Sequence, residues 1–137
     1  MTNIAKLAWA AGIVDGEGCI VLYKAKTRTG NAWVLRLTVT NTSKPMVMAL
    51  QDIFGMGNLI FSPRNNPRHK DIWRWEVATR KAEQALRLLL PYLVTKRREA
   101  ELGLASRRLI RQLGINTPNP NLRRLEDISR QMVALKH

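Results

Sequence analysis

Residues 9–20 read WAAGIVDGEGCI, and this stretch decides the fold. Small apolar residues lead into two acidic residues, Asp15 and Glu17, that alternate with glycines. Apolar residues recur at spacings of three and four over residues 3–15, which predicts an amphipathic helix that ends at Gly16 and Gly18. The recurring positions are Ile4, Leu7, Ala8, Ala11 and Val14. Two carboxylates at the end of an apolar helix need an explanation, because the rest of the chain is basic.

The net charge indicates an anionic partner. The 137 residues include 23 Lys and Arg against 10 Asp and Glu, a formal net charge of +13. Residues 61–137 hold 17 of the basic and 7 of the acidic residues, so most of the excess lies there. Self-repulsion of this size destabilises a compact chain, which favours nucleic acid as partner. A merely basic soluble protein is the plain alternative. An anionic membrane surface is less favoured, because the basic residues are spread over several elements.

Composition excludes several other classes of protein. A hydrophobic content of 45% suits one globular domain with a modest core. The single cysteine, Cys19, allows no internal disulfide and fits a reducing compartment. The two histidines, His69 and His137, are too far apart for a zinc site. No apolar run approaches the roughly 18 residues of a membrane span, and the N-terminus does not look like a secretory signal. We therefore expect a cytoplasmic protein, bacterial or phage, or one of an organellar matrix.

The pattern along the chain predicts an α-β-β-α-β-β-α order with further helices at the C-terminus. Strands with polar and apolar residues in alternation, joined by turn sequences, predict two hairpins. Ser43 and Thr79 are expected to cap helices, and Pro91 to kink or end one. The strands are expected at 19–28, 32–41, 57–64 and 71–78, and the later helices at 43–55, 79–93, 96–113 and after a linker that begins at 114. This is an α+β fold: a four-stranded antiparallel sheet with helices on one face and an open opposite face. Residues 1–113 would form one domain, and 114–137 a linker and a helix packed on it.

Residues 10–18, AAGIVDGEG, resemble the LAGLIDADG motif of the homing endonucleases. They depart from it at five positions, each a mild exchange: Ala10 for Leu, Ile13 for Leu, Val14 for Ile, Gly16 for Ala and Glu17 for Asp. The resemblance continues in LTVTNTSKPMVMALQDIFGMGNLI and WRWEVATRKAEQALRLLLPYLVTKRREAE, so it covers roughly residues 4–105. It implies a saddle-like sheet, double-stranded DNA as the partner, and a site-specific endonuclease that makes a staggered double-strand break in a long, roughly palindromic target.

The single motif implies a homodimer, because single-motif chains of this family pair through the motif helix. Small side chains on one face of that helix let another helix approach closely. The expected interface residues are Ala8, Trp9, Ala11 and Gly12. The alternative is ordinary burial of an alanine-rich helix against its own sheet.

Glu17 is the expected metal ligand, with Gly16 beside it in the metal site. Pairing of the motif helices would bring two copies of Glu17 together at helix C-termini, where the macrodipole is already negative. Such a site makes sense if it holds Mg²⁺, a hard cation that carboxylate and phosphate oxygens suit; Mn²⁺ would be another suitable cation, and Ca²⁺ a non-cleaving substitute. The alternative is that Glu17 is an exposed turn residue. By resemblance, Asp15 and Gly12 are structural parts of the motif.

The reaction implied is phosphodiester hydrolysis, in which metal ions activate a water and stabilise the attacking and leaving oxygens. By resemblance, a polar residue at the end of the second strand positions water, and a lysine after the third helix supports the charge of the transition state. Asn41 and Lys96 match these positions. Lys44 is an alternative to Asn41, and Lys96 could instead be a plain phosphate contact.

The open sheet face is expected to read bases in the major groove, where each base pair has its own donor and acceptor pattern. Tyr23 shares this face by strict alternation, yet the neighbouring Lys24, Lys26 and Arg28 look more like DNA contacts, and a bulge would reconcile them. The hairpin tips and the start of the helix after Pro91 would add phosphate contacts. The other expected DNA-binding residues are Arg36, Thr38, Thr40, Asn58, Ser62, Arg64, Arg68, Lys70, Arg74, Arg97 and Arg98.

Two rival functions remain open from the sequence. A degenerate endonuclease on the same fold could be an intron RNA maturase or a transcriptional regulator, which would keep the basic sheet without needing Glu17. A basic structural module without nucleic-acid chemistry would lack the steep salt dependence that several phosphate contacts give to DNA affinity.

Overall fold

The computed structural model describes residues 3–28, 30–113 and 120–136. Its order of helices and strands is the predicted one, with a 3-10 turn after the third helix. The elements are α1 (Ile4–Glu17), β1 (Gly18–Thr27), β2 (Gly30–Asn41), α2 (Lys44–Phe54), β3 (Asn58–Ser62), β4 (Ile72–Ala78), α3 (Arg80–Leu89), η1 (Leu90–Tyr92), α4 (Arg97–Arg111) and α5 (Pro120–Leu135). The predicted linker after 113 lies, for residues 114–119, outside the described residues.

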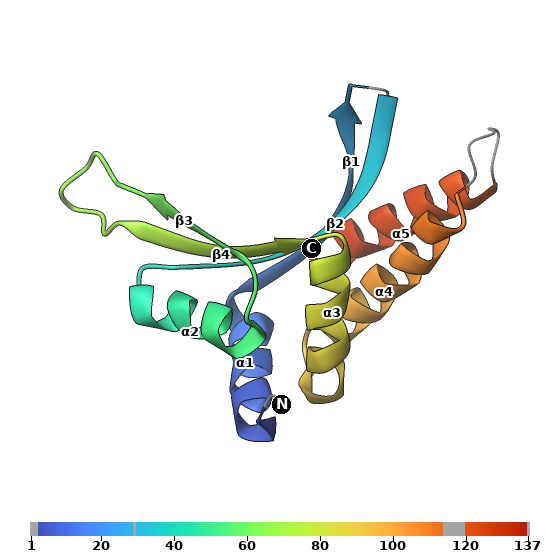
Figure 1. The fold of residues 1–137 in the computed structure, drawn as a ribbon. Coiled ribbons are helices and arrows are strands. Elements are labelled where there is room, and N and C mark those ends of the chain that lie inside the picture. Colours follow the sequence, from blue (N-terminus) through green and yellow to red (C-terminus); the bar gives the residue numbers. More distant parts are fainter. Residues whose placement is uncertain (1–2, 29, 114–119, 137) are drawn as a thin grey trace.

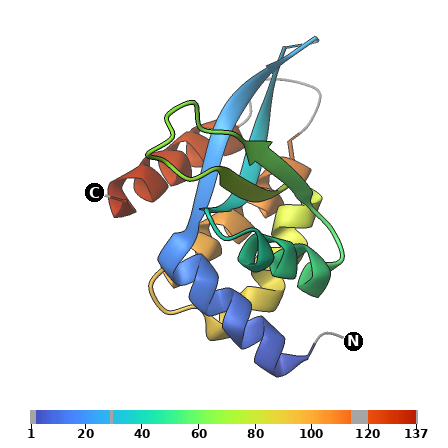
Figure 2. The same ribbon diagram turned by 90° about the vertical axis from the view of Figure 1, so that its left-hand side faces the viewer.

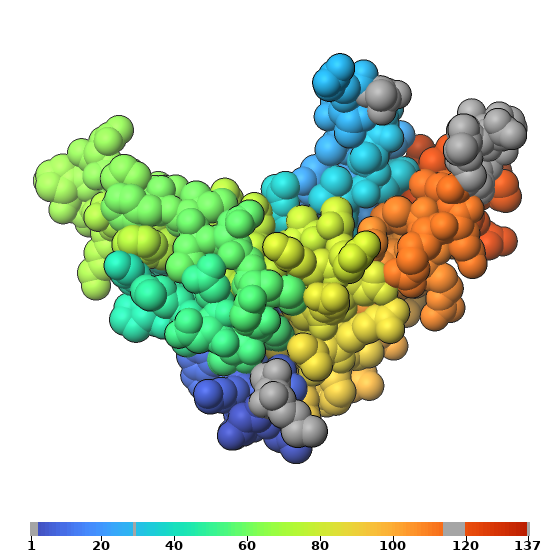
Figure 3. Space-filling model, viewed as in Figure 1, coloured from blue at the N-terminus to red at the C-terminus, as the bar shows by residue number. Residues whose placement is uncertain are grey.

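The four strands form one antiparallel sheet in the order β1-β2-β4-β3, which confirms the predicted fold class. The two hairpins diverge from each other, while α1 to α4 lie beneath the sheet (Figure 1). A view turned by 90° shows α1 below the strands and leading into β1 (Figure 2). The space-filling view shows an open hollow between the hairpins (Figure 3). One face of the sheet is therefore left free by these helices.

The register of the first hairpin corrects one expectation. β1 and β2 pair without interruption from Gly18↔Val39 to Thr27↔Gly30, so the described strands contain no bulge. Strict alternation therefore places Lys24 and Lys26 on the face opposite to Tyr23. Lys24 instead lies 3.5 Å from the carboxylate of Glu126 in α5 and over the ring of Trp33.

The core lies between the inner sheet face and the helices beneath it. Leu35, Leu37 and Val39 of β2 are fully buried, as the alternation of this strand predicts. Trp75 of β4 is also fully buried, and its indole N–H donates to the Met56 carbonyl at 3.0 Å. A Cβ at Gly57 would stand 2.3 Å from that indole nitrogen, and Gly57 has φ +114°, so only glycine fits there.

Two helix ends differ from the sequence prediction. The first helix does not stop at Gly16: α1 continues to Glu17, and the N–H of Gly18 caps it by donating to the Val14 carbonyl. Thr79 precedes α3 but makes no side-chain cap; its hydroxyl donates to the Ala78 carbonyl instead, and its φ is +54°. The cap predicted at Ser43 is present, since its hydroxyl accepts from the Met46 N–H.

The C-terminal helix α5 packs on α4 and β1. The Ser129 hydroxyl donates to the Leu22 carbonyl at 3.0 Å, and the Lys136 ammonium donates to the Ile20 carbonyl at 2.5 Å. These hydrogen bonds attach α5 to the backbone of β1. Among the described helices, none is both long enough and apolar enough to cross a bilayer.

A buried carboxylate joins α3 to α4. Glu83 accepts hydrogen bonds from Arg87, Arg107 and Arg111, the last at 2.6 and 2.8 Å. The hydrogen bond from Arg111 is the largest cause that lowers the pKa of Glu83 from 4.5 to about 2, against an opposing effect of burial. Arg107 and Arg111 are thus engaged within the fold.

We predict that Glu83→Gln lowers the free energy of unfolding at pH 7 by roughly 1–3 kcal/mol, because it removes the charged hydrogen-bond acceptor of three arginines, two of which are partly exposed. The folded pKa of Glu83 lies below its unfolded value, so the contribution is fully present above pH 4.5 and is lost as the pH falls toward 2. Denaturant titrations of wild type and variant should therefore converge at low pH. Glu101→Gln, on the exposed side of α4, is the matched control. A difference that stays constant down to pH 2 would contradict the assignment.

Candidate active site and nucleic-acid interface

The end of the motif helix is fastened to the segment that precedes α4. The Asp15 carboxylate accepts from the backbone N–H groups of Val94 and Lys96, both at 2.9 Å. The Lys96 ammonium in turn donates to the Asp15 backbone carbonyl at 2.8 Å. The end of α1 and the segment before α4, which are far apart in the sequence, are thus held together. The positive charge of Lys96 lies at the negative end of the α1 dipole.

Glu17 is the last residue of α1 and is exposed. Among the described residues, no ion pair or hydrogen bond engages its side chain. A carboxylate in this position is electrostatically unfavourable, because the helix C-terminus already carries partial negative charge. The carbonyls of the last helical turn, that of Gly16 among them, have no partner further along the helix. The end of α1 therefore presents oxygen donors to a cation.

The described part of one chain contains no cluster of metal-ligating side chains. Across the described residues, no three His, Cys, Asp or Glu side chains gather closely enough to hold a metal ion. The donor chemistry at Glu17 and Gly16 fits Mg²⁺, which takes one or two carboxylates and completes its shell with water and phosphate oxygens.

Asn41 ends β2 close to the end of α1. Val39, two residues before Asn41, pairs with Gly18, the first residue after Glu17, so the start of β1 and the end of β2 lie at the same end of the sheet. The Asn41 side-chain oxygen accepts from the Ser43 N–H at 2.8 Å. Lys44, the alternative, lies with its ammonium 4.8 Å from the centre of the Trp73 ring.

The motif helix has two faces with different environments. Leu7, Ala10, Ala11 and Val14 are buried within the chain, three of them completely. The expectation that Ala11 lies at an interface with a second copy is therefore wrong, because the helical period places it on the inner face.

The opposite face of α1 is uncovered. Ala8 and Gly12 are exposed, and Trp9 keeps 42% of its surface accessible. A Cβ added to Gly12 would meet no atom within 4 Å. The predicted interface residues other than Ala11 thus form a small-residue surface that only Trp9 interrupts.

The open face of the sheet carries the polar residues that alternation predicted. Residues of all four strands share this face by register, and several of them are polar. They are Tyr23, Arg36, Thr38, Thr40, Asn58, Ser62, Arg74 and Glu76. Glu76 is not among the residues predicted for this face, although its alternation with Trp75 and Val77 was sufficient to predict its place there.

Exposed basic residues lie at the tips of the two hairpins and at the start of α4. Arg64, Arg68 and Lys70 lie in the exposed loop between β3 and β4, where the Arg64 N–H donates to the Asp71 carboxylate. Arg28 is exposed at the tip of the other hairpin. Arg97 and Arg98 are exposed in the first turn of α4, an end that favours anions rather than cations, so these two charges are best placed beside an anionic partner.

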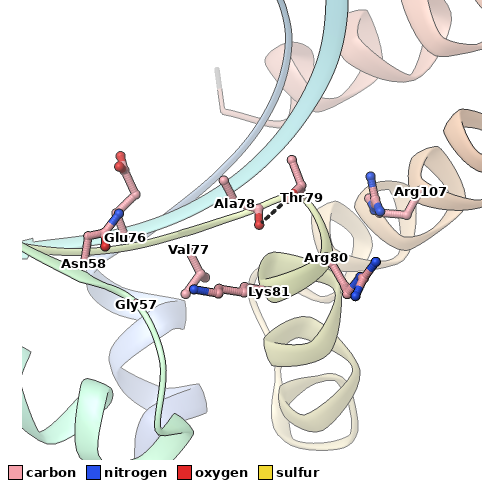
Figure 4. A pocket seen from close by; sticks show the side chains of 9 residues that line it. All are labelled: Gly57, Asn58, Glu76, Val77, Ala78, Thr79, Arg80, Lys81 and Arg107. Carbon is pink, nitrogen blue, oxygen red and sulfur yellow. Dashed lines mark hydrogen bonds between the residues drawn. The ribbon is translucent and has the colours of Figure 1, made fainter.

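A hollow of about 570 Å³ opens beside β4 at the start of α3 (Figure 4). Its lining combines Arg80, Lys81 and Arg107 with Asn58 and Glu76. The Glu76 side chain points away from Arg80 and Lys81. The hollow therefore lies next to the open face, and Glu76 belongs to that face.

Solved structures of similar fold are homing endonucleases. The chain is 27% identical to the homing endonuclease I-CvuI, with a TM-score of 0.78 over 96% of this chain and 82% of that one. That protein was crystallised with the I-CreI target in 2 mM Mg, with the DNA not cleaved, and with its own target in 2 mM Ca. The archaeal intron-encoded homing endonuclease I-Vdi141I, complexed with DNA, has a TM-score of 0.76 at 15% identity, with 97% of this chain and 85% of that one covered. No family model and no curated protein sequence matches the chain.

We predict that Asp15→Asn lowers the free energy of unfolding by about 1–3 kcal/mol, because two backbone N–H groups lose a charged acceptor. Glu17→Gln is the matched control two residues away, and it should leave stability within about 0.5 kcal/mol of wild type or raise it. Thermal and denaturant unfolding measure both. Equal losses in the two variants would contradict the distinct roles of the two carboxylates.

Proposed function

We propose that this chain, which belongs to the LAGLIDADG homing endonuclease family, is a site-specific, Mg²⁺-dependent DNA endonuclease that acts as a homodimer. The observation that carries the proposal is the end of α1. There, the hydrogen bonds between Asp15 and the segment at Lys96 hold an exposed, unpartnered Glu17 at the edge of an open sheet.

The open face suits double-stranded DNA. Its polar residues offer hydroxyl, amide and guanidinium groups that can meet base edges, and the exposed arginines and lysines at the hairpin tips and at the start of α4 can meet phosphates. The DNA complexes of structurally similar homing endonucleases support this use of the fold. Electrostatic attraction from a net charge of +13 would speed the encounter with DNA.

Glu17 and the Gly16 carbonyl would hold the cation, together with phosphate oxygens and water. Bound Mg²⁺ would supply activation of a water and stabilisation of the oxygens that attack and leave. The Lys96 ammonium keeps two further N–H donors beyond its bond to Asp15. These donors can stabilise negative charge that develops on a phosphate at the end of α1. Asn41, at the same end of the sheet, offers its amide N–H₂ to orient a water.

A second copy of the chain completes the site. One chain provides one exposed motif carboxylate, whereas two helices that pack through Ala8 and Gly12 would place two beside each other. Small side chains permit this close approach. A two-fold dimer would also read a roughly palindromic target, since each copy presents the same sheet to its half-site.

We predict that Glu17→Gln retains DNA binding and loses cleavage by roughly 100-fold or more, the scale seen when a group that stabilises transition-state charge is removed. The assay is cleavage of a randomised duplex library in Mg²⁺, with binding measured in Ca²⁺. Glu101→Gln, which removes the same charge from the exposed side of α4, should cut like wild type.

Two outcomes would count against this assignment. Cleavage by Glu17→Gln at the wild-type rate would remove Glu17 from the metal site. Specific DNA binding by a wild type that cuts nothing in the library would favour the non-cleaving alternative, a maturase or transcriptional regulator on the same fold.

We predict that Gly12→Leu converts the dimer to a monomer, because a leucine side chain holds the two helices apart. Within one chain the new side chain meets open space, and leucine favours a helix by about 0.7 kcal/mol over glycine, so the fold should remain. Light scattering measures the mass of the protein with and without DNA. Ala134→Leu, on the exposed side of α5, is the control and should leave the mass unchanged. A Gly12→Leu protein of unchanged dimeric mass would contradict this interface.

A further inference from the structure

The open sheet face contains one acid that the proposed function leaves unexplained. Over strand residues 18–27, 30–41, 58–62 and 72–78, Glu76 is the only aspartate or glutamate. Register places it opposite Thr38 on β2 and opposite Asn58 on β3, in the interior of the sheet. An acid in this position repels the phosphate backbone, so a DNA-binding face would not carry it without a specific partner.

Glu76 and Arg36 form a shielded pair whose hydrogen bonding is incomplete. The Oε1 atom of Glu76 lies 3.4 Å from the Nε atom of Arg36, and the Glu76 side chain is only 15% exposed. Both atoms are buried without a hydrogen-bond partner. The Arg36 guanidinium also lies 5.0 Å from the centre of the Tyr23 ring, which holds it over the sheet. Because these two atoms are buried, a group that approaches from the open side can meet only the rest of the pair, of which 36% of the Arg36 side chain and 15% of the Glu76 side chain are exposed.

DNA that docks on this face would displace water from the exposed part of the Glu76 side chain, whose Oε1 atom is already buried beside Arg36. A desolvated carboxylate that finds no donor is strongly unfavourable. In the major groove, guanine and thymine present acceptors, whereas cytosine presents its N4 amino group as a donor, the usual partner of a glutamate. The chemistry of Glu76 thus rejects three bases and accepts one, with adenine rejected because its amino group stands beside the N7 acceptor.

We propose that Glu76 is a specificity-determining residue that accepts a hydrogen bond from the N4 amino group of a cytosine in the target. Arg36, held by the same carboxylate, donates to the guanine of that base pair. This inference rests on the proposed function only in requiring sequence-specific DNA binding; it does not require cleavage.

The test is selection of bound duplexes from a randomised library by the full-length protein in Ca²⁺, followed by sequencing. Wild type should prefer cytosine over other bases by roughly tenfold at one position in each half-site. Glu76→Gln should change that preference to adenine, because an amide side chain matches the N6 and N7 pattern of adenine, while all other positions keep their preferences. The control variant Glu101→Gln should keep the wild-type preference for cytosine.

Each outcome has a distinct meaning. If Glu76→Gln selects the same bases as wild type, the inference about Glu76 is overturned, while the proposed function stands. Suppose that Glu76→Gln loses the preference for the cytosine–guanine pair but gains no preference for adenine. That result would also overturn the inference, because Glu76 would then only orient Arg36. Absence of any sequence preference in wild type would overturn the proposed function and the inference with it. Unfolding curves of Glu76→Gln that match wild type show that its fold is intact, and Glu76→Asp, which keeps the carboxylate, should retain cytosine.

Discussion

The fold depends at one point on the hydrogen bonds between the Asp15 carboxylate and the backbone of Val94 and Lys96. They join positions 79 and 81 residues apart in the chain. They also fix the place where a helix, the first strand of the sheet and the start of α4 meet. Both oxygens of the Asp15 carboxylate accept hydrogen bonds within the chain, whereas the Glu17 carboxylate has no hydrogen bond or ion pair among the described residues. The two carboxylates of one short motif thus acquire different roles from their hydrogen-bonding environment.

The same helix serves two surfaces. Its inner face, with Leu7 and Val14, packs into the core, while its outer face presents Ala8, Trp9 and Gly12 to solvent. A helix with large side chains all around could not offer both a tight internal fit and a close approach to another helix. In the proposed dimer, the small residues of the motif would therefore link the stability of one chain to the assembly of two, and through that assembly to the proposed metal site.

The sequence predicted the order of elements and the faces of the second strand because both follow from local periodicity. Alternation in residues 33–40 assigned Leu35, Leu37 and Val39 to the core and Arg36 and Thr38 to the open face. The prediction that Lys24 contacts DNA departed from this alternation, and the uninterrupted register places Lys24 on the opposite face. The prediction for Ala11 was wrong, since a row of small residues does not reveal which of them its own core will cover.

Other features depend on contacts that local patterns do not encode. The cluster of Glu83 with Arg107 and Arg111 requires the packing of α3 on α4, and nothing in their spacing announces it. Thr79 looked like a cap, yet its positive φ directs the hydroxyl to the preceding carbonyl. Glu76 was visible as an alternating residue, but its pairing with Arg36 follows from the alignment of β2 with β4 and was accessible only from the structure.

The most direct measurement is a crystal structure of the full chain with DNA recovered by selection and with Ca²⁺. The account predicts two copies packed through the outer faces of α1, with a cation bound by Glu17 of each copy and by phosphate oxygens, and with both open sheet faces in the major groove. A complex in which α1 faces solvent, or in which Glu17 lies away from both cation and phosphate, would contradict it.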